Sequence, residues 1–361
     1  MPLPMTSRRI VVIGPQFSGR DGLSEFSRQV VLALADGPQP VVVRSLADEA
    51  PPEQFEGPQI NFVSVGRGAW RLAAAALNSA DRRDLVVIMH AHLLPFALPA
   101  LLRGARVAAM LIGIESWKEL SWLHRAVLAR SRVVAISQHT ADRFRSANPY
   151  ASRVPIAICH PAVPGSVPAG DAVVRPGFAL MVGRMSAEER YKGHDAVLNA
   201  WPIVRASCPD ARLVIAGDGD DRSRLEEKAG SAGMRDHVAF VGRVEPSALA
   251  ALYRDACFFL MPSRDEGFGL VYLEAMRDAL PCIASPGAAH EIFGESSAGL
   301  LVPHGDVHAI ADACVRLFRD PALRVAMGQA GRQRVMSDFE FPAFVRRLRD
   351  AVGVGAGVAA C

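Results

Sequence analysis

The stretch that decides the fold of this chain reads Cys-Phe-Phe-Leu-Met-Pro-Ser-Arg-Asp-Glu-Gly-Phe-Gly-Leu-Val-Tyr-Leu-Glu, from Cys257 to Glu274. Its first five residues form a short apolar run that ends at Pro262, which is typical of a buried strand. Apolar side chains recur at helical spacing from Leu270 onward, so the glycines lie where a strand is followed by a helix. A helix N-terminus carries unpaired N–H groups and a partial positive charge, and glycines let a phosphate approach the backbone. The pattern therefore predicts an α/β unit that binds an anionic ligand at this turn.

Two acidic residues bracket the turn. Glu266 lies in the loop directly before Gly267, Phe268 and Gly269, and Glu274 lies more than one helical turn further on. Either carboxylate could accept hydrogen bonds from sugar hydroxyls. Taken singly, Glu266 is equally consistent with a charge at a helix start, and Glu274 with a solvated helix face. The complete pattern favours a site for a phosphorylated sugar.

A second segment has the same design with the opposite charge. Residues 178–182 form a buried-strand pattern that is followed by Gly183 and Arg184, and Lys192 then opens a helix. An arginine can bind phosphate oxygens with two parallel hydrogen bonds, while a lysine adds a point charge. The alternative is two surface cations near a turn. Beside the first segment, this one predicts a diphosphate site.

Two more strands end at glycines in the same half of the chain. Residues 212–216 lead into Gly217, and residues 238–241 lead into a turn that contains Arg243 and Val244, whose backbone could read a nucleobase edge. Each of these patterns is weak alone. All four in this order indicate a nucleotide-sugar pocket at the carboxyl ends of parallel strands.

These residues resemble the retaining glycosyltransferases of the GT-B fold, family 4. The resemblance is strong over residues 178–305 and looser over the N-terminal half. It implies that Glu266 faces the donor hexose, that Glu274 binds the donor ribose, and that Arg184 and Lys192 bind the diphosphate. The backbone around Gly267, Phe268, Gly269 and Leu270 would complete the donor site. The loop from Met185 to Tyr191 is a few residues longer than the commonest form in the family.

The resemblance also implies a fold and a mechanism. We expect two Rossmann-like domains whose parallel sheets face each other across a cleft. The donor is expected to be a GDP- or UDP-linked hexose, transferred with retention at the anomeric carbon to a saccharide or lipid-linked acceptor. The leaving phosphate itself would take the acceptor's proton, while Arg184, Lys192 and helix-start amides stabilise the departing diphosphate. No metal or other cofactor is expected, because in the family the counterpart of Asp218-Gly219-Asp220 lies beside the nucleotide without metal. An epimerase or hydrolase of the same fold is disfavoured by the spacing of Glu266 and Glu274.

Alternating strand and helix patterns run through the whole chain and predict parallel sheets covered by helices. A stretch rich in proline and glycine, from Pro161 to Pro176, suggests an interdomain linker. We therefore expect an acceptor-binding domain over residues 1–165 and a donor-binding domain over residues 166–337. By the resemblance, residues 338–361 should hold a helix that crosses back to the first domain, followed by a tail. The strands expected in the first half are residues 10–13, 41–43, 85–89, 107–111, 133–136 and 155–158.

The N-terminal half supplies weaker candidates. Gly19 and Gly22 follow the first strand without a dinucleotide-binding fingerprint, which argues against an oxidoreductase. The family's equivalent loop closes over the donor phosphates. His90 and His92 follow the strand ending at Met89, where acceptor contact or local packing is favoured over a metal pair.

One position departs from the family. Many relatives have His-Gly after the strand that ends near Leu111, with the histidine near the reaction centre, whereas this chain has Ile112 and Gly113. Glu115 then becomes a candidate acceptor contact. The substitution leaves open a second hypothesis, that the chain is a catalytically silent GT-B protein that serves as a binding or partner subunit. The presence of Arg184, Lys192 and both glutamates favours an active enzyme.

Charge is unevenly distributed along the 361 residues. Residues 1–168 carry 18 Lys and Arg against 12 Asp and Glu, and most of the excess lies between Arg103 and Arg153. Within that region, residues 117–130 mix tryptophan and leucine with Lys118, Arg125 and Arg130. Such a helix can rest on an anionic membrane, although an ordinary core-facing helix fits as well. Nucleic acid binding is disfavoured, because no recognised nucleic-acid motif accompanies the charge.

The remaining features concern the compartment. No apolar run is long enough to span a bilayer, and residues 1–9 lead directly into the first strand without a signal peptide. The six cysteines are scattered and lack a C-x-x-C pair, which indicates a reducing compartment without disulfides or structural zinc. We expect a cytoplasmic protein, with peripheral attachment to the inner face of the plasma membrane as an option.

Overall fold

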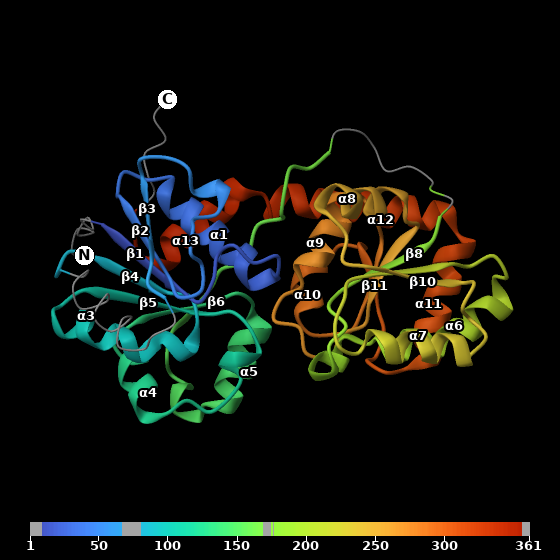
Figure 1. The fold of residues 1–361 in the computed structure, drawn as a ribbon, viewed down its shortest axis with the longest axis horizontal. Coiled ribbons are helices and arrows are strands. Elements are labelled where there is room, and N and C mark those ends of the chain that lie inside the picture. The colour runs from blue at the N-terminus through green and yellow to red at the C-terminus, as the bar shows by residue number, and fades with distance from the viewer. Residues whose placement is uncertain (1–8, 67–80, 169–174, 176, 356–361) are drawn as a thin grey trace. The chain divides into compact units, whose positions relative to one another are not determined.

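The computed structural model describes residues 9–66, 81–168, 175 and 177–355 of the chain (Figure 1). These residues form two compact units, Met1–Ala162 together with Phe339–Cys361, and Val163–Asp338. The prediction that no signal peptide is present rests mainly on residues 1–8, which lie outside the described residues. So do residues 169–174 and 176 of the expected linker and residues 356–361 of the expected tail.

The first unit contains a seven-stranded parallel sheet in the order β3-β2-β1-β4-β5-β6-β7. The central strand β1 is fully buried, and Val12 lies between Val43 and Val87 on the neighbouring strands. Strands that are buried on both faces consist of continuous apolar runs, and such runs predict most strands of this sheet from the sequence. The strands are β1 (Ile10–Gly14), β2 (Val41–Ser45), β3 (Ile60–Ser64), β4 (Leu85–Ile88), β5 (Arg106–Leu111), β6 (Arg132–Ala135) and β7 (Ile156–Ile158).

Strand β3 is not among the strands that the sequence predicts. It pairs with β2 alone, at the edge of the sheet, and its five residues are half-buried or exposed. An edge strand needs no continuous apolar run, so Ile60-Asn61-Phe62 gave no clear pattern.

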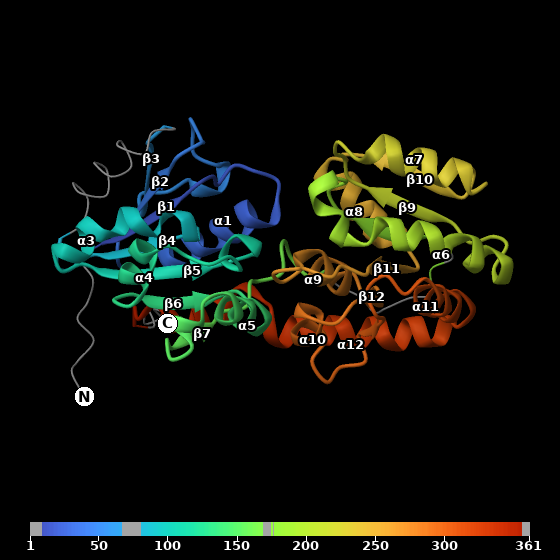
Figure 2. The ribbon, with the colours of Figure 1, turned by 90° about the horizontal axis from the view of Figure 1, so that it is seen from below.

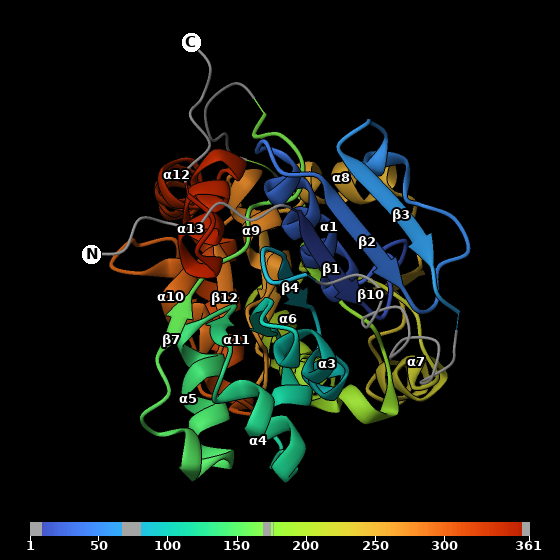
Figure 3. The ribbon, with the colours of Figure 1, turned by 90° about the vertical axis from the view of Figure 1, so that its left-hand side faces the viewer.

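Helices cover both faces of this sheet (Figure 2). The helices α1 (Gly22–Ala35) and α13 (Phe341–Val352) lie side by side on one face (Figure 3). The ring of Phe344 packs against that of Phe26 at 6.0 Å, and the buried Arg349 donates to the carbonyl oxygen of Leu34 at 3.3 Å. The last helix therefore belongs to the first unit. The other face carries η2 (Ala91–Ala97), α3 (Leu98–Leu102), α4 (Trp122–Leu128) and α5 (Gln138–Ala147), and short 3₁₀ turns occur at η1 (Glu53–Phe55), η3 (Ile114–Ser116) and η4 (Pro149–Ala151).

The second unit contains a six-stranded parallel sheet in the order β10-β9-β8-β11-β12-β13. Its strands are β8 (Ala179–Val182), β9 (Leu213–Ala216), β10 (Val238–Gly242), β11 (Phe258–Met261), β12 (Cys282–Ala284) and β13 (Gly299–Leu301). The chain order reverses between β8 and β11, which is the place where ligands bind in open α/β sheets. Both strands run in the same direction, so the loops that follow them meet at one edge.

The helices of the second unit also form two layers (Figure 1). In one layer, the ring of Phe318 joins two neighbouring helices to the sheet, because it packs against Trp201 at 6.2 Å and against Phe258 of β11 at 4.8 Å. The helical elements are η5 (Ala187–Lys192), α6 (His194–Ser207), α7 (Arg222–Ser231), α8 (Pro246–Asp255), α9 (Leu270–Arg277), α10 (Ala288–Phe293), α11 (Val307–Arg319) and α12 (Pro321–Asp338).

The expected aromatic and basic helix over residues 117–130 is wrong as a single element. Only Trp122–Leu128 is helical. Trp117 is drawn into a separate contact, with its ring 5.5 Å from that of His139 and with the Arg143 guanidinium 4.9 Å above it. This packing holds Trp117 outside the helix, which begins after Ser121.

Across the described ranges, no helix is long and apolar enough to cross a membrane. The five cysteines among these residues are free thiols, and four of them are buried.

Candidate active site

The loop after β8 brings two cations to the end of β11. Arg184 follows Gly183, the first residue after β8, and its side chain is 63% exposed. The chain then folds as η5 and turns at Gly193, which has a left-handed φ of 90°. A Cβ at Gly193 would lie 2.8 Å from the carbonyl oxygen of Pro262, so only glycine allows this approach to the segment after β11. The turn places Lys192 beside the loop that carries Glu266.

Lys192 lies between two carboxylates. Its Nζ is 3.6 Å from Oε2 of Glu266 and 3.9 Å from Oε2 of Glu189. Arg184 also contacts Glu189, with its Nε donating to Oε2 at 3.2 Å and a terminal nitrogen donating to Oε1. We call Arg184, Glu189, Lys192 and Glu266 the charged cluster. It unites the three residues that the sequence predicts as catalytic.

Glu266 retains capacity to bind a ligand. Its Oε2 is buried and has no hydrogen-bond partner in the described part of the chain. The ion pair with Lys192, at 3.6 Å, is too long to be a hydrogen bond. A buried carboxylate oxygen without a donor is costly, so a hydroxyl group from a ligand would be stabilised here. Behind it, Gly267, Phe268 and Gly269 lead into Leu270, the first residue of α9, and the ring of Phe268 is buried.

Glu274 is held by a residue that the sequence did not reveal. The Tyr253 hydroxyl, from α8, donates to Oε2 of Glu274 at 2.8 Å. Burial and the neighbouring Glu274 raise the pKa of Tyr253, so the phenol stays a protonated donor. Glu274 is therefore oriented on α9 before any ligand arrives.

The loop after β9 packs on the β8 loop that carries Arg184, whereas the loop after β10 makes no described contact with the charged cluster. Gly217 has a φ of 137°, and a side chain there would collide with the carbonyl oxygen of Gly183, so this glycine lets the β8 and β9 loops stack. The Met185 amide donates to the Asp218 carbonyl at 3.0 Å across the same contact. Arg243 is exposed and Val244 half-buried after β10, and the described contacts draw neither into the charged cluster.

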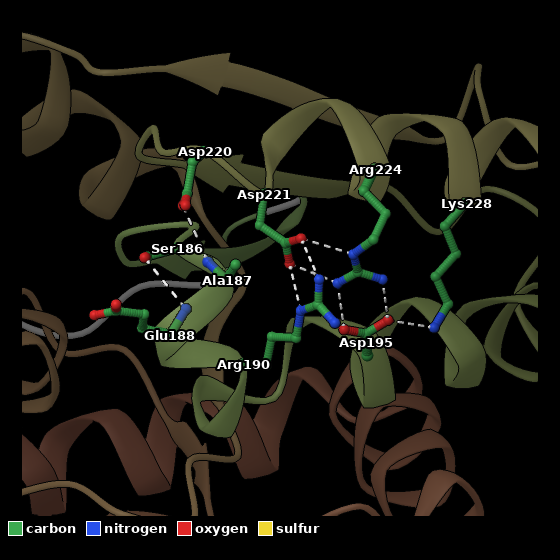
Figure 4. Close-up of polar contacts among 9 residues, drawn as sticks. All are labelled: Ser186, Ala187, Glu188, Arg190, Asp195, Asp220, Asp221, Arg224 and Lys228. Carbon is green, nitrogen blue, oxygen red and sulfur yellow. Dashed lines mark hydrogen bonds and ion pairs between the residues drawn. The ribbon is translucent and has the colours of Figure 1, made fainter.

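A network of salt bridges holds the loop from Met185 to Tyr191 in place (Figure 4). Arg190 of η5 contacts Asp221 at 2.9 Å, and Arg224 contacts both Asp221 at 2.6 Å and Asp195 at 2.7 Å. Lys228 completes it by donating to Asp195 at 2.6 Å. The hydrogen bonds from Arg224 outweigh burial and lower the pKa of Asp221 to about 2.

The Asp-x-Asp motif supports the same loop. The amide of Ala187 donates to Oδ1 of Asp220 at 3.0 Å, while Asp218 lies 3.8 Å from Arg222. Within the described residues, no group of three or more His, Cys, Asp or Glu is placed to hold a metal ion.

His194 opens α6 directly behind Lys192. The imidazole is buried, and its Nε2 has no hydrogen-bond partner among the residues the structure describes. Burial, followed by the charge of Lys192, lowers the pKa of His194 to about 4. The ring is therefore neutral near pH 7.

The N-terminal candidates lie in the first unit. Gly19 and Gly22 flank Asp21, whose side chain accepts from the Ser24 amide at 2.9 Å and so caps α1. Arg28 donates to the Gly19 carbonyl at 2.7 Å, which fixes this glycine loop at the helix start.

The predicted acceptor residues form a second group. The rings of His90 and His92 pack edge to face at 5.0 Å, and Oε1 of Glu115 accepts from the Gly113 amide at 2.9 Å. Burial lowers the pKa of His90, against the neighbouring Glu115 that raises it. We call His90, His92 and Glu115 the imidazole cluster. Ile112 is buried just after β5, so the position where relatives are expected to carry a histidine is filled by packing.

Comparison with known proteins identifies the family. Residues 177–320 match the family model of glycosyl transferases group 1. The chain is 32% identical, over 293 residues, to the GDP-mannose-dependent alpha-(1-6)-phosphatidylinositol monomannoside mannosyltransferase of Mycobacterium tuberculosis, which covers 74% of this chain and 75% of that protein. The chain belongs to the group 1 glycosyltransferases. Family 4 of the GT-B fold, expected from the sequence, is confirmed.

Other relatives and solved structures agree. The group 1 glycosyltransferase described here is 28% identical over 236 residues to the alpha-D-kanosaminyltransferase of Streptomyces kanamyceticus, covering 65% of this chain and 58% of that one. Its fold matches sucrose-phosphate synthase from Thermosynechococcus elongatus with a TM-score of 0.78 at 21% identity, over 95% of this chain and 98% of that chain. It also matches Anabaena Alr3699/HepE in complex with UDP, with a TM-score of 0.77 at 17% identity, over 95% and 99% of the two chains. The similarity to these solved structures shows the fold.

Proposed function

We propose that this glycosyltransferase moves a hexose from a nucleotide diphosphate sugar to a saccharide or lipid-linked acceptor, with retention at the anomeric carbon. The observation that carries the proposal is the position of Lys192, between Glu266 and Glu189 and next to Arg184, where β8 and β11 end. Two cations on the loop between β8 and α6 suit a diphosphate, and the Glu266 oxygen that has no hydrogen-bond partner among the described residues suits a sugar hydroxyl.

The proposed chemistry assigns one task to each residue. Arg184 and Lys192 stabilise the charge that develops on the leaving diphosphate, while Glu266 holds the hexose near the bond that breaks. Glu274, oriented by Tyr253, binds the donor ribose. The leaving phosphate takes the acceptor's proton, so the reaction needs neither a protein nucleophile nor a metal ion.

The donor is proposed to be linked to GDP or UDP. GDP-mannose is the first to test, because relatives from Mycobacterium tuberculosis and Corynebacterium glutamicum are named as GDP-mannose-dependent mannosyltransferases. Both names also specify a phosphatidylinositol monomannoside acceptor, which favours a lipid-linked acceptor here.

A lipid-linked acceptor implies work at a membrane surface. We propose a cytoplasmic enzyme that contacts anionic lipid through the segment around α4, where Trp122 is 76% exposed and Ile114 is 41% exposed. The exposed Lys118 lies on the same segment. Exposed aromatic groups with nearby cations are the features that bind the interface of an anionic bilayer.

Proton NMR of the reaction tests the proposal. The enzyme is incubated with GDP-mannose or UDP-glucose, and the anomeric signal of the hexose is followed as it is transferred or released to water. We expect the α configuration of the donor to appear first in the product. A β product would contradict retention, and binding without turnover of any nucleotide sugar would favour the silent subunit.

A further inference from the structure

The two cations proposed to bind the donor diphosphate already have an anionic partner. Glu189 accepts from Nε and a terminal nitrogen of Arg184, and it lies 3.9 Å from Nζ of Lys192. This two-pronged contact is the geometry that an arginine offers to a phosphate group. The carboxylate of Glu189 thus takes the arginine donors that a phosphate would need.

The contact between Glu189 and Arg184 also changes the net charge of the site. The charged cluster holds two cations, Arg184 and Lys192, and two carboxylates, Glu189 and Glu266. Its formal charge is therefore zero. Both carboxylates also lie close to Tyr191. The pKa of Tyr191 is raised, first by burial and then by the negative charges of Glu189 and Glu266. A diphosphate would meet a neutral site as long as Glu189 stays in place.

The loop that carries Glu189 has anchors of its own, so it can stay in place when the Glu189 side chain leaves. Its neighbours in the loop are fixed independently, Ala187 by Asp220 at 3.0 Å and Arg190 by Asp221 at 2.9 Å. Glu189 itself has non-helical backbone angles, with φ −112° and ψ 25°. Arg184 is 63% exposed, so water can replace Glu189 as the partner of its guanidinium, whereas the Glu189 side chain is only 15% exposed. A rotation of one side chain, without movement of the loop, would release Arg184 and leave Lys192 paired with Glu266 alone.

We propose that Glu189 is an internal counter-ion, which occupies Arg184 and Lys192 in the free enzyme and is displaced by the diphosphate of the donor. The inference rests on the proposed function and adds a residue that sets the donor affinity. It gives the longer loop between Arg184 and Lys192 a purpose, since this loop carries Glu189. Such competition lowers the apparent affinity by the fraction of enzyme in which the cations are free.

Calorimetric titration of the full chain with GDP and with inorganic pyrophosphate tests the proposal. Glu189→Gln keeps the shape of the side chain and removes its charge, and we expect it to bind both ligands about tenfold more tightly, the factor expected if Glu189 occupies the cations roughly nine-tenths of the time. Guanosine, which lacks phosphate, should bind the variant and the wild type equally. Glu188→Gln is the matched control, because Glu188 is exposed and points away from the salt-bridge network (Figure 4). It should change none of the affinities.

The outcomes separate this proposal from the proposed function. Equal or weaker binding of GDP and pyrophosphate by Glu189→Gln, with Lys192→Ala still impaired, would overturn the counter-ion and leave the diphosphate site intact. It would mean that Glu189 orients Arg184 for the phosphate instead. Unimpaired binding of GDP by Lys192→Ala would overturn both proposals. Glu189→Ala serves as a second variant and should tighten binding in the same direction.

Discussion

The charged cluster of the second unit and the imidazole cluster of the first unit occupy the same kind of place, the carboxyl edge of a parallel sheet, and differ in chemistry. The charged cluster joins four ionised side chains from two loops, with Lys192 between Glu189 and Glu266. The imidazole cluster is built from His90 and His92, whose rings pack edge to face, and from Glu115, whose carboxylate accepts from the backbone amide of Gly113. The opposite charges of the charged cluster suit one kind of ligand group, such as a diphosphate. The side chains of the imidazole cluster are compatible with a wider range of ligands.

The largest expected effect lies in the charged cluster. Lys192→Ala should lower turnover about 100- to 1,000-fold, because a preorganised donor to a developing charge is worth about 2.7–4 kcal/mol of activation free energy. Turnover of the purified variant is compared with that of Arg212→Ala, which removes an exposed cation at the opposite end of β9. A folded Lys192→Ala enzyme with wild-type turnover would remove the distinction between the two clusters.

The next effect concerns the free energy of unfolding and compares the buried imidazole of His194 with the exposed imidazole of His308. The pKa of His194 lies at about 4, below its ordinary 6.5, so the unfolded chain binds more protons between these values. The contribution of His194 is therefore fully present above pH 6.5 and is lost as the pH falls toward 4, up to about 3 kcal/mol in the free energy of unfolding. Urea denaturation at pH 7.5 and 5 should show about 2 kcal/mol of this loss. His194→Gln should flatten this dependence, whereas the exposed His308→Gln should not; an unchanged slope in His194→Gln would refute the assignment.

A smaller effect should divide the two glutamates. Glu274→Ala is expected to weaken binding of the bare nucleoside diphosphate about tenfold, because Glu274 is oriented for the ribose by Tyr253. Glu266→Ala should spare that binding and reduce hexose transfer instead, since its contact is to the sugar. Titration of both variants with nucleoside diphosphate and with nucleotide sugar decides. Equal loss of the bare diphosphate would show that this division is wrong.

The smallest effect is expected in the first unit. Lys118→Ser should weaken binding to vesicles that contain phosphatidylserine about fivefold, since one cation at an anionic surface contributes about 1 kcal/mol. Trp122→Ser should add to the loss without changing nucleotide binding. Co-sedimentation at low and high salt measures both, and identical sedimentation of the double variant would leave α4 as an ordinary surface helix.

The sequence revealed the parts of the molecule that depend on neighbouring residues. The strand and helix around Glu266 could be predicted because β11, its glycines and α9 are contiguous and have distinct periodicities. The strand β3 could not, since an edge strand carries no continuous apolar run. The ion pair between Lys192 and Glu266 was not predicted, because it depends on the adjacency of β8 and β11; the family resemblance assigned the two residues only to the same donor site.

Residues that act across elements were missed for the same reason. Tyr253 reaches Glu274 from a different helix, and Glu189 reaches Arg184 only because the intervening loop folds into η5. Neither contact corresponds to a periodic pattern of residues in the sequence. His194 was the exception that the sequence could have shown, since it directly follows Lys192 and Gly193 at the start of a helix.

The central claim is that Arg184 and Lys192 bind the diphosphate of the donor. The most direct test is calorimetric titration of the wild-type enzyme and Lys192→Ala with GDP, UDP and the matching monophosphates, all in EDTA. The account predicts that the preferred diphosphate binds at least about tenfold more tightly than its monophosphate, a difference of about 1.4 kcal/mol, and that Lys192→Ala abolishes the difference. Monophosphate and diphosphate binding with equal affinity, or a preference that survives in Lys192→Ala, would contradict it.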